Sequence, residues 1–185
     1  MFDLHIYRDG AKPPLPFHYQ IQSFVRMMWS DGDDYDIDYG LNAPSSSMVV
    51  VLANGNTLIS HVEVICTALE LAGQSYKCYG LSGVMTYPAF RKRGFAGQVI
   101  DTAAALIRED PEADVALLWT AHHNVPFYVA HGWEAMPNLM TLTGDRTQPD
   151  VFDEEMRMML FLSEKGKAAR PAFEQGRVYV GQEHW

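Results

Sequence analysis

The segment from Val84 to Gly97 constrains the fold of this chain more than any other part of its sequence. It reads VMTYPAFRKRGFAG: a β-rich run stops at Pro88, a basic turn with Gly94 follows, and a helix opens at Phe95. The free N–H groups at the start of a helix, together with the helix dipole, form a site for phosphate oxygens. The segment therefore predicts a strand, an anion-binding turn and a helix in direct succession.

The turn follows the pattern Arg-x-x-Gly-x-Ala, with consecutive cations at Arg91, Lys92 and Arg93. Such a cluster suits a ligand that carries several phosphates. A Walker loop requires Gly-x4-Gly-Lys-Ser/Thr, and a dinucleotide fold requires Gly-x-Gly-x-x-Gly after its first strand; the turn has neither spacing. A surface turn with merely solvated cations is the other interpretation. Because of the segments on both sides, we interpret it as a cofactor-binding turn.

Those flanking segments have the periodicities of a meander followed by alternating helices and strands. The hairpin signal Asn54-Gly55 and a turn at residues 72–74 separate three β-rich runs. After the turn, apolar residues at helical spacing and then a short apolar run predict a helix and a buried strand. The predicted strands are residues 1–7, 47–53, 58–71, 75–87, 115–119 and 156–162, and the predicted helices are 95–108, 124–131 and one with Phe17, Ile21, Phe24, Val25 and Met28 on its apolar face.

This order of elements, with these residues, resembles the GCN5-related N-acetyltransferase (GNAT) superfamily. The resemblance covers roughly residues 47–142 and includes a second segment with Asn124, Phe127-Tyr128 and Gly132-Trp133. It implies an α/β (α+β) fold, a single GNAT-like domain with a mixed, mostly antiparallel central sheet flanked by helices. Residues 1–185 would form one acyl-CoA N-acyltransferase domain, with a strand, helix and acidic acceptor-side loop (1–46), a cofactor core (47–142), and a C-terminal strand and pocket-closing tail (143–185).

The resemblance also implies the cofactor, acetyl-CoA, and roles for individual residues. In that superfamily the strand before the turn pairs with the pantetheine arm, and the turn holds the pyrophosphate. Transfer is direct: an amine attacks the thioester, with the N–H near Met85 as the oxyanion donor and Tyr128 as the acid for the departing thiolate. The implied cofactor-binding residues are Val84, Met85, Thr86, Arg91, Lys92, Arg93, Gly94, Phe95, Ala96, Gly97 and Asn124.

Taken as a whole, the chain is similar to the aminoglycoside 2'-N-acetyltransferases, one branch of that superfamily. The hairpin at residues 54–62, the run at 78–84 and the ending Glu183-His184-Trp185 carry this similarity. It implies an antibiotic-resistance enzyme in which acidic side chains and the terminal carboxylate line a pocket for a polycationic acceptor. The implied substrate-binding residues are Asp33, Asp34, Asp36, Ser82, Gly83, Glu183 and Trp185.

The general base is left open by the sequence. That branch places a glutamate on the strand before the turn where this chain has Ser82, and a serine cannot remove a proton from an ammonium group at neutral pH. Another group must then take the proton, or water must pass it to bulk solvent. The candidates are Glu63, Glu183, the Trp185 carboxylate, an acid of the first acidic loop, and His122 or His123.

Charge and composition favour a cationic acceptor. The formal net charge is −9, with acids clustered at residues 31–38 and 150–155, which attracts cations and disfavours nucleic acid. Solvated acidic loops are the simpler explanation of each cluster. No apolar run approaches the ~20 residues that span a bilayer, no signal peptide is recognisable, and two cysteines imply no disulfide framework. We expect a cytoplasmic protein with no metal and no membrane partner, for which a homodimer is compatible with the resemblance.

Three functions from different classes remain open. The first is a small-molecule amine acetyltransferase, and the second is a protein or peptide N-acetyltransferase with the same fold. The third is a non-catalytic CoA-binding sensor, which Ser82 favours, whereas the retained turn and Tyr128 favour an enzyme. The segment 166–185, expected to close a pocket, favours a small acceptor over an extended peptide.

Overall fold

The computed structural model of the chain describes residues 2–28, 48–152 and 154–181. It divides into two compact units: the first consists of Met1–Ile65 and Leu81–Ala105, and the second of Cys66–Gly80 and Leu106–Trp185. Two long strands, β3 (Thr57–Leu71) and β4 (Gln74–Thr86), contribute residues to both units. Each unit has its own apolar core, so we describe each by itself.

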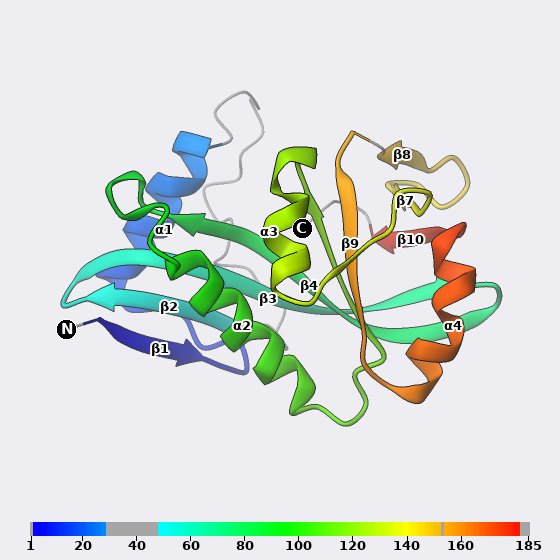
Figure 1. Cartoon of the computed structure of the whole chain (residues 1–185), viewed down its shortest axis with the longest axis horizontal. Coiled ribbons are helices and arrows are strands. Elements are labelled where there is room, and N and C mark those ends of the chain that lie inside the picture. Colours follow the sequence, from blue (N-terminus) through cyan, green and yellow to red (C-terminus); the bar gives the residue numbers. More distant parts are fainter. Residues whose placement is uncertain (1, 29–47, 153, 182–185) are drawn as a thin grey trace. The chain divides into compact units, whose positions relative to one another are not determined.

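The first unit is built on antiparallel strands β1 (Asp3–Tyr7), β2 (Met48–Asn54) and the first part of β3. Gly55, at φ 57°, lies in the tight turn between β2 and β3, where a positive φ favours glycine. Helix α1 (Leu15–Met28) covers one face of these strands, and Figure 1 shows α2 (Phe95–Arg108) crossing in front of them. The core beneath α1 consists of Phe17, Ile21, Phe24, Val25, Val49, Val51, Ala53, Leu58 and Met85.

The second unit carries a mixed sheet with the strand order β6-β9-β5-β4-β3-β10-β7-β8. Strand β5 is parallel to β4 and antiparallel to β9, and β10 is parallel to β7 and antiparallel to β3. The strands are β5 (Val115–Thr120), β6 (Glu134–Ala135), β7 (Met140–Thr143), β8 (Asp150–Phe152), β9 (Met156–Phe161) and β10 (Arg177–Gly181). The helices that begin in this unit are α3 (Val125–Ala130) and α4 (Glu164–Glu174).

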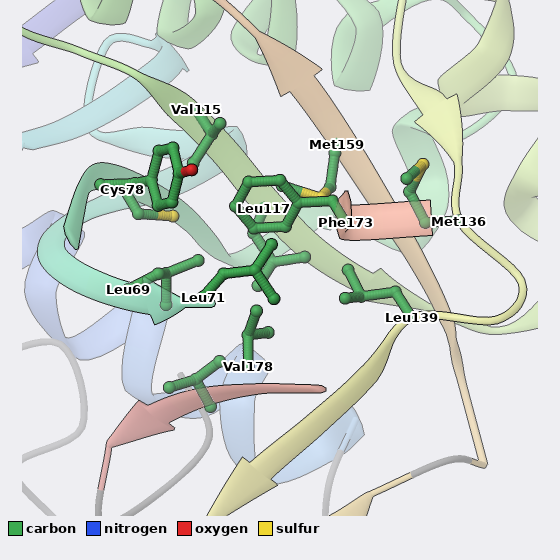
Figure 2. Packing of buried hydrophobic residues seen from close by; sticks show 12 residues of the cluster. Leu69, Leu71, Cys78, Val115, Leu117, Met136, Leu139, Met159, Phe173 and Val178 are labelled. Carbon is green, nitrogen blue, oxygen red and sulfur yellow. The ribbon is translucent and has the colours of Figure 1, made fainter. Parts of the chain in front are cut away.

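Phe173 of α4 is the central side chain of the second core. Figure 2 shows it next to Leu117 of β5 and Met159 of β9, and it is fully buried. Its ring contacts Tyr76 with the centroids 5.2 Å apart and Phe161 at 5.9 Å, and such tilted aromatic pairs add to the free energy of burial. Burial of one α4 side chain among three strands therefore fixes this helix against the sheet.

The first turn of α4 is held by Asp114, the residue before β5. The Asp114 carboxylate accepts hydrogen bonds from Ser163 Oγ at 2.6 Å and Lys165 Nζ at 2.7 Å. Gly166 leaves no room for a side chain here, because a Cβ at this position would clash with the Asp114 carbonyl oxygen. The close approach of helix and strand thus requires glycine at this position.

Most of the predicted elements are confirmed, including a helix whose observed bounds, Phe95–Arg108, are the predicted ones. The α/β class, with a mixed and mostly antiparallel sheet between helices, is also confirmed. Two details differ: Met28 on α1 is 48% exposed, and Asn124 belongs to a 3-10 turn before α3. Within the segment expected to be a tail, the described residues form most of α4 and all of β10.

Candidate active site

The predicted cofactor-binding turn lies wholly within the first unit. Strand β4 ends at Thr86, a single 3-10 turn η1 (Pro88–Phe90) follows, and α2 begins at Phe95. Lys92 and Gly94 both have positive φ, 60° and 80°, which turn the chain sharply into the helix. Arg91 Nε donates a hydrogen bond to the Thr86 carbonyl at 3.0 Å and so closes the turn back onto the strand.

The start of α2 is open to a ligand. A Cβ built on Gly94 would meet nothing within 4 Å, and the residues from Arg91 to Gly94 are exposed. Gln98 N–H bonds to the Gly94 carbonyl at 3.2 Å, so the amides of Phe95, Ala96 and Gly97 precede the first bonded N–H of the helix. No acidic residue lies in this first helical turn. Free N–H groups, the helix dipole and an uncovered backbone together fit an anion.

The three cations of the turn are held in different ways. Arg93 stacks over the rings of Phe90 and Phe95, at 5.5 and 5.1 Å from their centroids. Arg91 also lies 3.4 Å from the Met28 sulfur through Nη2. Within the described residues, none of the three forms an ion pair with a carboxylate. Their charge is therefore not neutralised by any carboxylate of the described residues.

The backbone of β4 before the turn shows which groups face β3. Tyr87 N–H donates to the Ile59 carbonyl at 2.9 Å, and the Met85 carbonyl accepts from Ser60 Oγ at 2.8 Å. In an extended strand, backbone groups of successive residues point to opposite sides. Because Tyr87 and Met85 face β3, the N–H groups of Val84 and Thr86 point away from it. This pattern favours Val84, rather than the predicted Met85, as a backbone donor to a ligand.

Pairing between β4 and its other neighbour stops early. The parallel register with β5 covers Cys78–Gly80, whereas β4 continues to Thr86. Beyond that register, Ser82 is buried and Gly83 has φ 55°, a left-handed conformation that interrupts regular strand geometry. Both were predicted to contact the acceptor; the structure places them on β4 between the paired part of the strand and the turn.

Tyr128, the predicted acid, lies on α3 in the second unit and is 6% exposed. Burial raises the pKa of its phenol to about 12; the Thr120 side chain opposes this by hydrogen bonding, and the charge of Glu155 adds to it. The phenol therefore keeps its proton at neutral pH. A protonated phenol retains the proton that a departing thiolate requires, although the raised pKa makes it a weaker acid than an exposed tyrosine.

The other predicted residues that the structure describes in the second unit are exposed. Asn124, His122 and His123 form the 3-10 turn η2 (His122–Asn124), and the Asn124 side chain makes no capping hydrogen bond to α3. Gly132, at φ 83°, follows α3 as predicted for a left-handed helix end. The predicted acceptor residues Asp33, Asp34, Asp36, Glu183 and Trp185 lie outside the described residues.

Two features of the structure were not predicted as such. The first is a pair of buried ionisable side chains on β3, His61 and Glu63, which are 2% and 6% exposed. The sequence signal was present, because both interrupt an otherwise apolar run. The second is a cavity of about 520 Å³ in the second unit, whose lining includes Arg108, Asp110, Glu134, Ser163 and Lys167. Its mixed charges identify no class of ligand.

Neither a metal centre nor a membrane segment is found in the described ranges. No group of three or more His, Cys, Asp or Glu side chains there could hold a metal ion. No helix among the same residues has the length and apolar character needed to cross a membrane.

Comparisons with known proteins assign the turn and the segment around it to a known family of domains. A family model described as an acetyltransferase (GNAT) domain matches residues 20–136, more than half of the chain. This range contains the turn, β4, both buried residues of β3 and Tyr128. A search of curated proteins gave no match.

Solved structures share the fold at low sequence identity. An acyl-CoA N-acyltransferase from Pseudomonas aeruginosa is 12% identical and matches 86% of this chain and 99% of its own, with a TM-score of 0.61. NAA60 of Arabidopsis thaliana, solved with a bisubstrate analogue, is 13% identical over 86% and 98%, also at 0.61. An aminoglycoside 6'-N-acetyltransferase complexed with coenzyme A is 13% identical over 86% and 97%, at 0.57.

Proposed function

The chain belongs to the GNAT family of acetyltransferases, and we propose that it transfers the acetyl group of acetyl-CoA to a primary amine of a small cationic acceptor. It is an enzyme by this family membership, and acetyl-CoA is the donor of the family. The observation that carries the proposal is the turn of the first unit. There an uncovered glycine, an open helix start and cations without acidic partners among the described residues occur together.

In this proposal the turn binds the phosphates of the donor. The amides of Phe95, Ala96 and Gly97 and the side chains of Arg91, Lys92 and Arg93 hold the pyrophosphate, with Gly94 allowing close approach. The outward N–H groups of Val84 and Thr86 bind the thioester arm, and Val84 is the oxyanion donor. Met85, which was predicted for this role, faces β3 and instead shapes the apolar core beneath α1.

Tyr128 is the proposed acid. As the amine nitrogen bonds to the acetyl carbon, the carbon–sulfur bond breaks and the sulfur takes a proton from the phenol. The raised pKa of Tyr128 ensures that this proton is present at neutral pH. Asn124 remains a proposed contact to the donor.

The net charge of the chain supports a cationic acceptor. With a net charge of −9, the chain attracts polyamines and aminosugars more strongly than neutral amines. An aminoglycoside is the acceptor we propose, bound by Asp33, Asp34, Asp36, Ser82, Gly83, Glu183 and Trp185, and the enzyme would then confer antibiotic resistance. The alternatives that experiments must exclude are a peptide acceptor and a non-catalytic CoA sensor. A cytoplasmic location and a homodimer also remain proposals.

Calorimetric titration of coenzyme A into Gly94→Glu tests the turn. A carboxylate at this position would repel the pyrophosphate, so we expect the affinity to fall at least 100-fold. Gly73→Glu is the matched control: Gly73 has φ 76° and open space around its Cβ, but it lies in the hairpin at the opposite end of β4. Both variants carry the same charge change and similar backbone strain. Unchanged affinity in Gly94→Glu, or an equal loss in both variants, would refute the turn as the donor site.

A further inference from the structure

The register of the first unit places ionisable side chains in two rows on the face that α1 covers. Tyr7 of β1 pairs with Val49 of β2, which pairs with Glu63 of β3. His5 pairs with Val51, which pairs with His61. Directly paired residues of neighbouring strands point to the same face. Because Val49 and Val51 belong to the core beneath α1, Glu63 and His61 point to that side as well.

Among the described residues, Glu63 and His61 are buried without the partners that such groups usually have. The Nδ1 atom of His61 has no hydrogen-bond partner in the part of the chain that the structure describes. For Glu63, burial alone shifts the pKa, with no contribution from a hydrogen bond or a nearby charge of the described residues. The surrounding α1 side chains are Phe17, Ile21, Phe24 and Val25, all apolar. Burying a carboxyl group and an imidazole in such surroundings costs free energy. Valine, which occupies the facing β2 positions, would avoid that cost.

These two residues lie beside the part of β4 that leads into the turn. Ser60 of β3 contacts the Thr86 hydroxyl at 2.8 Å and the Met85 carbonyl at 2.8 Å. The two strands run in opposite directions, so Glu63, three residues along β3 from Ser60, lies opposite the part of β4 that contains Ser82 and the left-handed Gly83. Glycine adds no side chain from β4 at that point. The carboxyl group thus lies next to the segment proposed to bind the thioester.

We propose that Glu63 is the general base of the acetyl transfer, in a buried site that it shares with His61, two residues away on the same face of β3. The assignment rests on the proposed function and fills the role left open by Ser82. It selects one of the candidates from the sequence, because Glu63 combines a carboxylate, burial in the first unit and a position beside β4. Perturbed carboxyl groups in such surroundings are typical of acid–base sites.

The step balances without any further reactant. The acceptor ammonium gives one proton to the Glu63 carboxylate, directly or through one water molecule, and becomes a neutral amine. Its nitrogen forms a bond to the acetyl carbon while the carbon–sulfur bond breaks. The thiolate takes a proton from the Tyr128 phenol. The attacking nitrogen gives its second proton to the resulting phenolate, which restores the phenol. Glu63 then releases its proton to bulk water, so one proton is released in each turnover.

Burial raises the pKa of Glu63 to about 7, which is suited to a base that works near neutral pH. The ionisable groups that face it are His61 on its own strand and Tyr7 and His5 on β1. From β4 the apolar Met85 packs against the same core. Burial also lowers the pKa of His61 to about 4, so this imidazole is neutral when Glu63 accepts a proton.

The test compares Glu63→Gln with Glu70→Gln in the full-length protein, with tobramycin as acceptor. Glu70 is an exposed residue of the same strand that pairs with Arg146 at 3.3 Å. We expect kcat for Glu63→Gln to fall about 100-fold at pH 7 with the KM for acetyl-CoA unchanged, and to recover as pH rises above the pKa of the amine. Glu70→Gln should behave as wild type. Wild-type kcat in Glu63→Gln, or a loss that pH does not restore, overturns the proposal.

A second measurement needs no turnover. Carboxyl-carbon NMR of the wild-type protein should show one glutamate resonance, absent from Glu63→Gln, that titrates near pH 7. A midpoint at the ordinary value of a glutamate overturns the assignment. If wild type binds coenzyme A but acetylates no amine, the proposed transfer fails, whereas the NMR midpoint still decides whether this carboxyl group has the properties of a base.

Discussion

Replacing Glu63 by glutamine should stabilise the protein at alkaline pH far more than at acidic pH. Glutamine has nearly the same shape and cannot ionise, so the variant removes only the titration of a buried carboxyl group. In the folded chain the pKa of Glu63 is about 7, against 4.5 for an unperturbed glutamate. Between these values the unfolded chain has released this proton and the folded chain retains it. The contribution of Glu63 to the free energy of unfolding is therefore fully present below pH 4.5 and is lost as pH rises through 7.

The magnitude follows from the size of this shift. A rise of 2.5 pKa units, from 4.5 to about 7, corresponds to roughly 3 kcal/mol over the whole window. About 2.5 kcal/mol of it develops between pH 5 and pH 8. His61 contributes with the opposite sign, because its pKa is lowered to about 4 and its stabilising effect is lost as pH falls from 6.5. Comparing variant with wild type at each pH cancels the His61 contribution.

Urea unfolding at pH 5 and at pH 8 provides the assay. We expect the free energy of unfolding of Glu63→Gln to gain about 2.5 kcal/mol on wild type between the two pH values. For Glu70→Gln the difference from wild type should stay within about 1 kcal/mol at both, because an exposed ion pair contributes little. A pH-independent difference for Glu63→Gln would show that its carboxyl group is solvated, and would remove the physical basis for its role as a base.

Three other predictions concern the acid, the helix α4 and the acceptor. Tyr128→Phe should lower kcat about 100-fold while leaving the affinity for coenzyme A unchanged. Tyr19→Phe, at a 60% exposed position, serves as the control. Equal turnover in the two variants would refute the role of Tyr128 as the acid. Gly166→Ala should cost about 3 kcal/mol in urea unfolding because its Cβ meets the Asp114 carbonyl, and a wild-type urea midpoint would contradict that close approach. Neutralising Asp33, Asp34 and Asp36 together should raise the KM for tobramycin and leave the KM for acetyl-CoA unchanged. Equal effects on the two KM values would exclude the loop that carries these acids from the acceptor site.

Elements governed by local periodicity could be predicted from the sequence. Helix α2 was predicted with its observed bounds because its apolar spacing is regular and the Gly94 turn and Asp110-Pro111 delimit it. The strands around Asn54-Gly55 were predicted for a similar reason. The short strands β7, β8 and β10 were missed, since their residues carry little periodicity of their own. In addition, the partners of β10, which are β3 and β7, are distant from it in sequence.

The candidate site was predicted less completely than the fold. The cations and glycine of the turn form one contiguous motif, and the structure places them together. Which backbone groups of β4 face outward depends on strand register, so Met85 could not be distinguished from Val84 in the sequence. The burial of Glu63 likewise depends on α1, which packs over it from a distant part of the chain. Both proposals therefore depend on long-range packing and not on the local sequence pattern.

The central claim, acetyl transfer from acetyl-CoA to an amine, is tested most directly by thiol release. The wild-type protein is incubated with acetyl-CoA and with tobramycin, spermidine or a basic peptide, and free coenzyme A and the acetylated product are measured together. We predict release that depends on the amine, with one acetylated amine formed per thiol and the highest rate for tobramycin. Tight binding of coenzyme A without thiol release to any of these amines would contradict the claim.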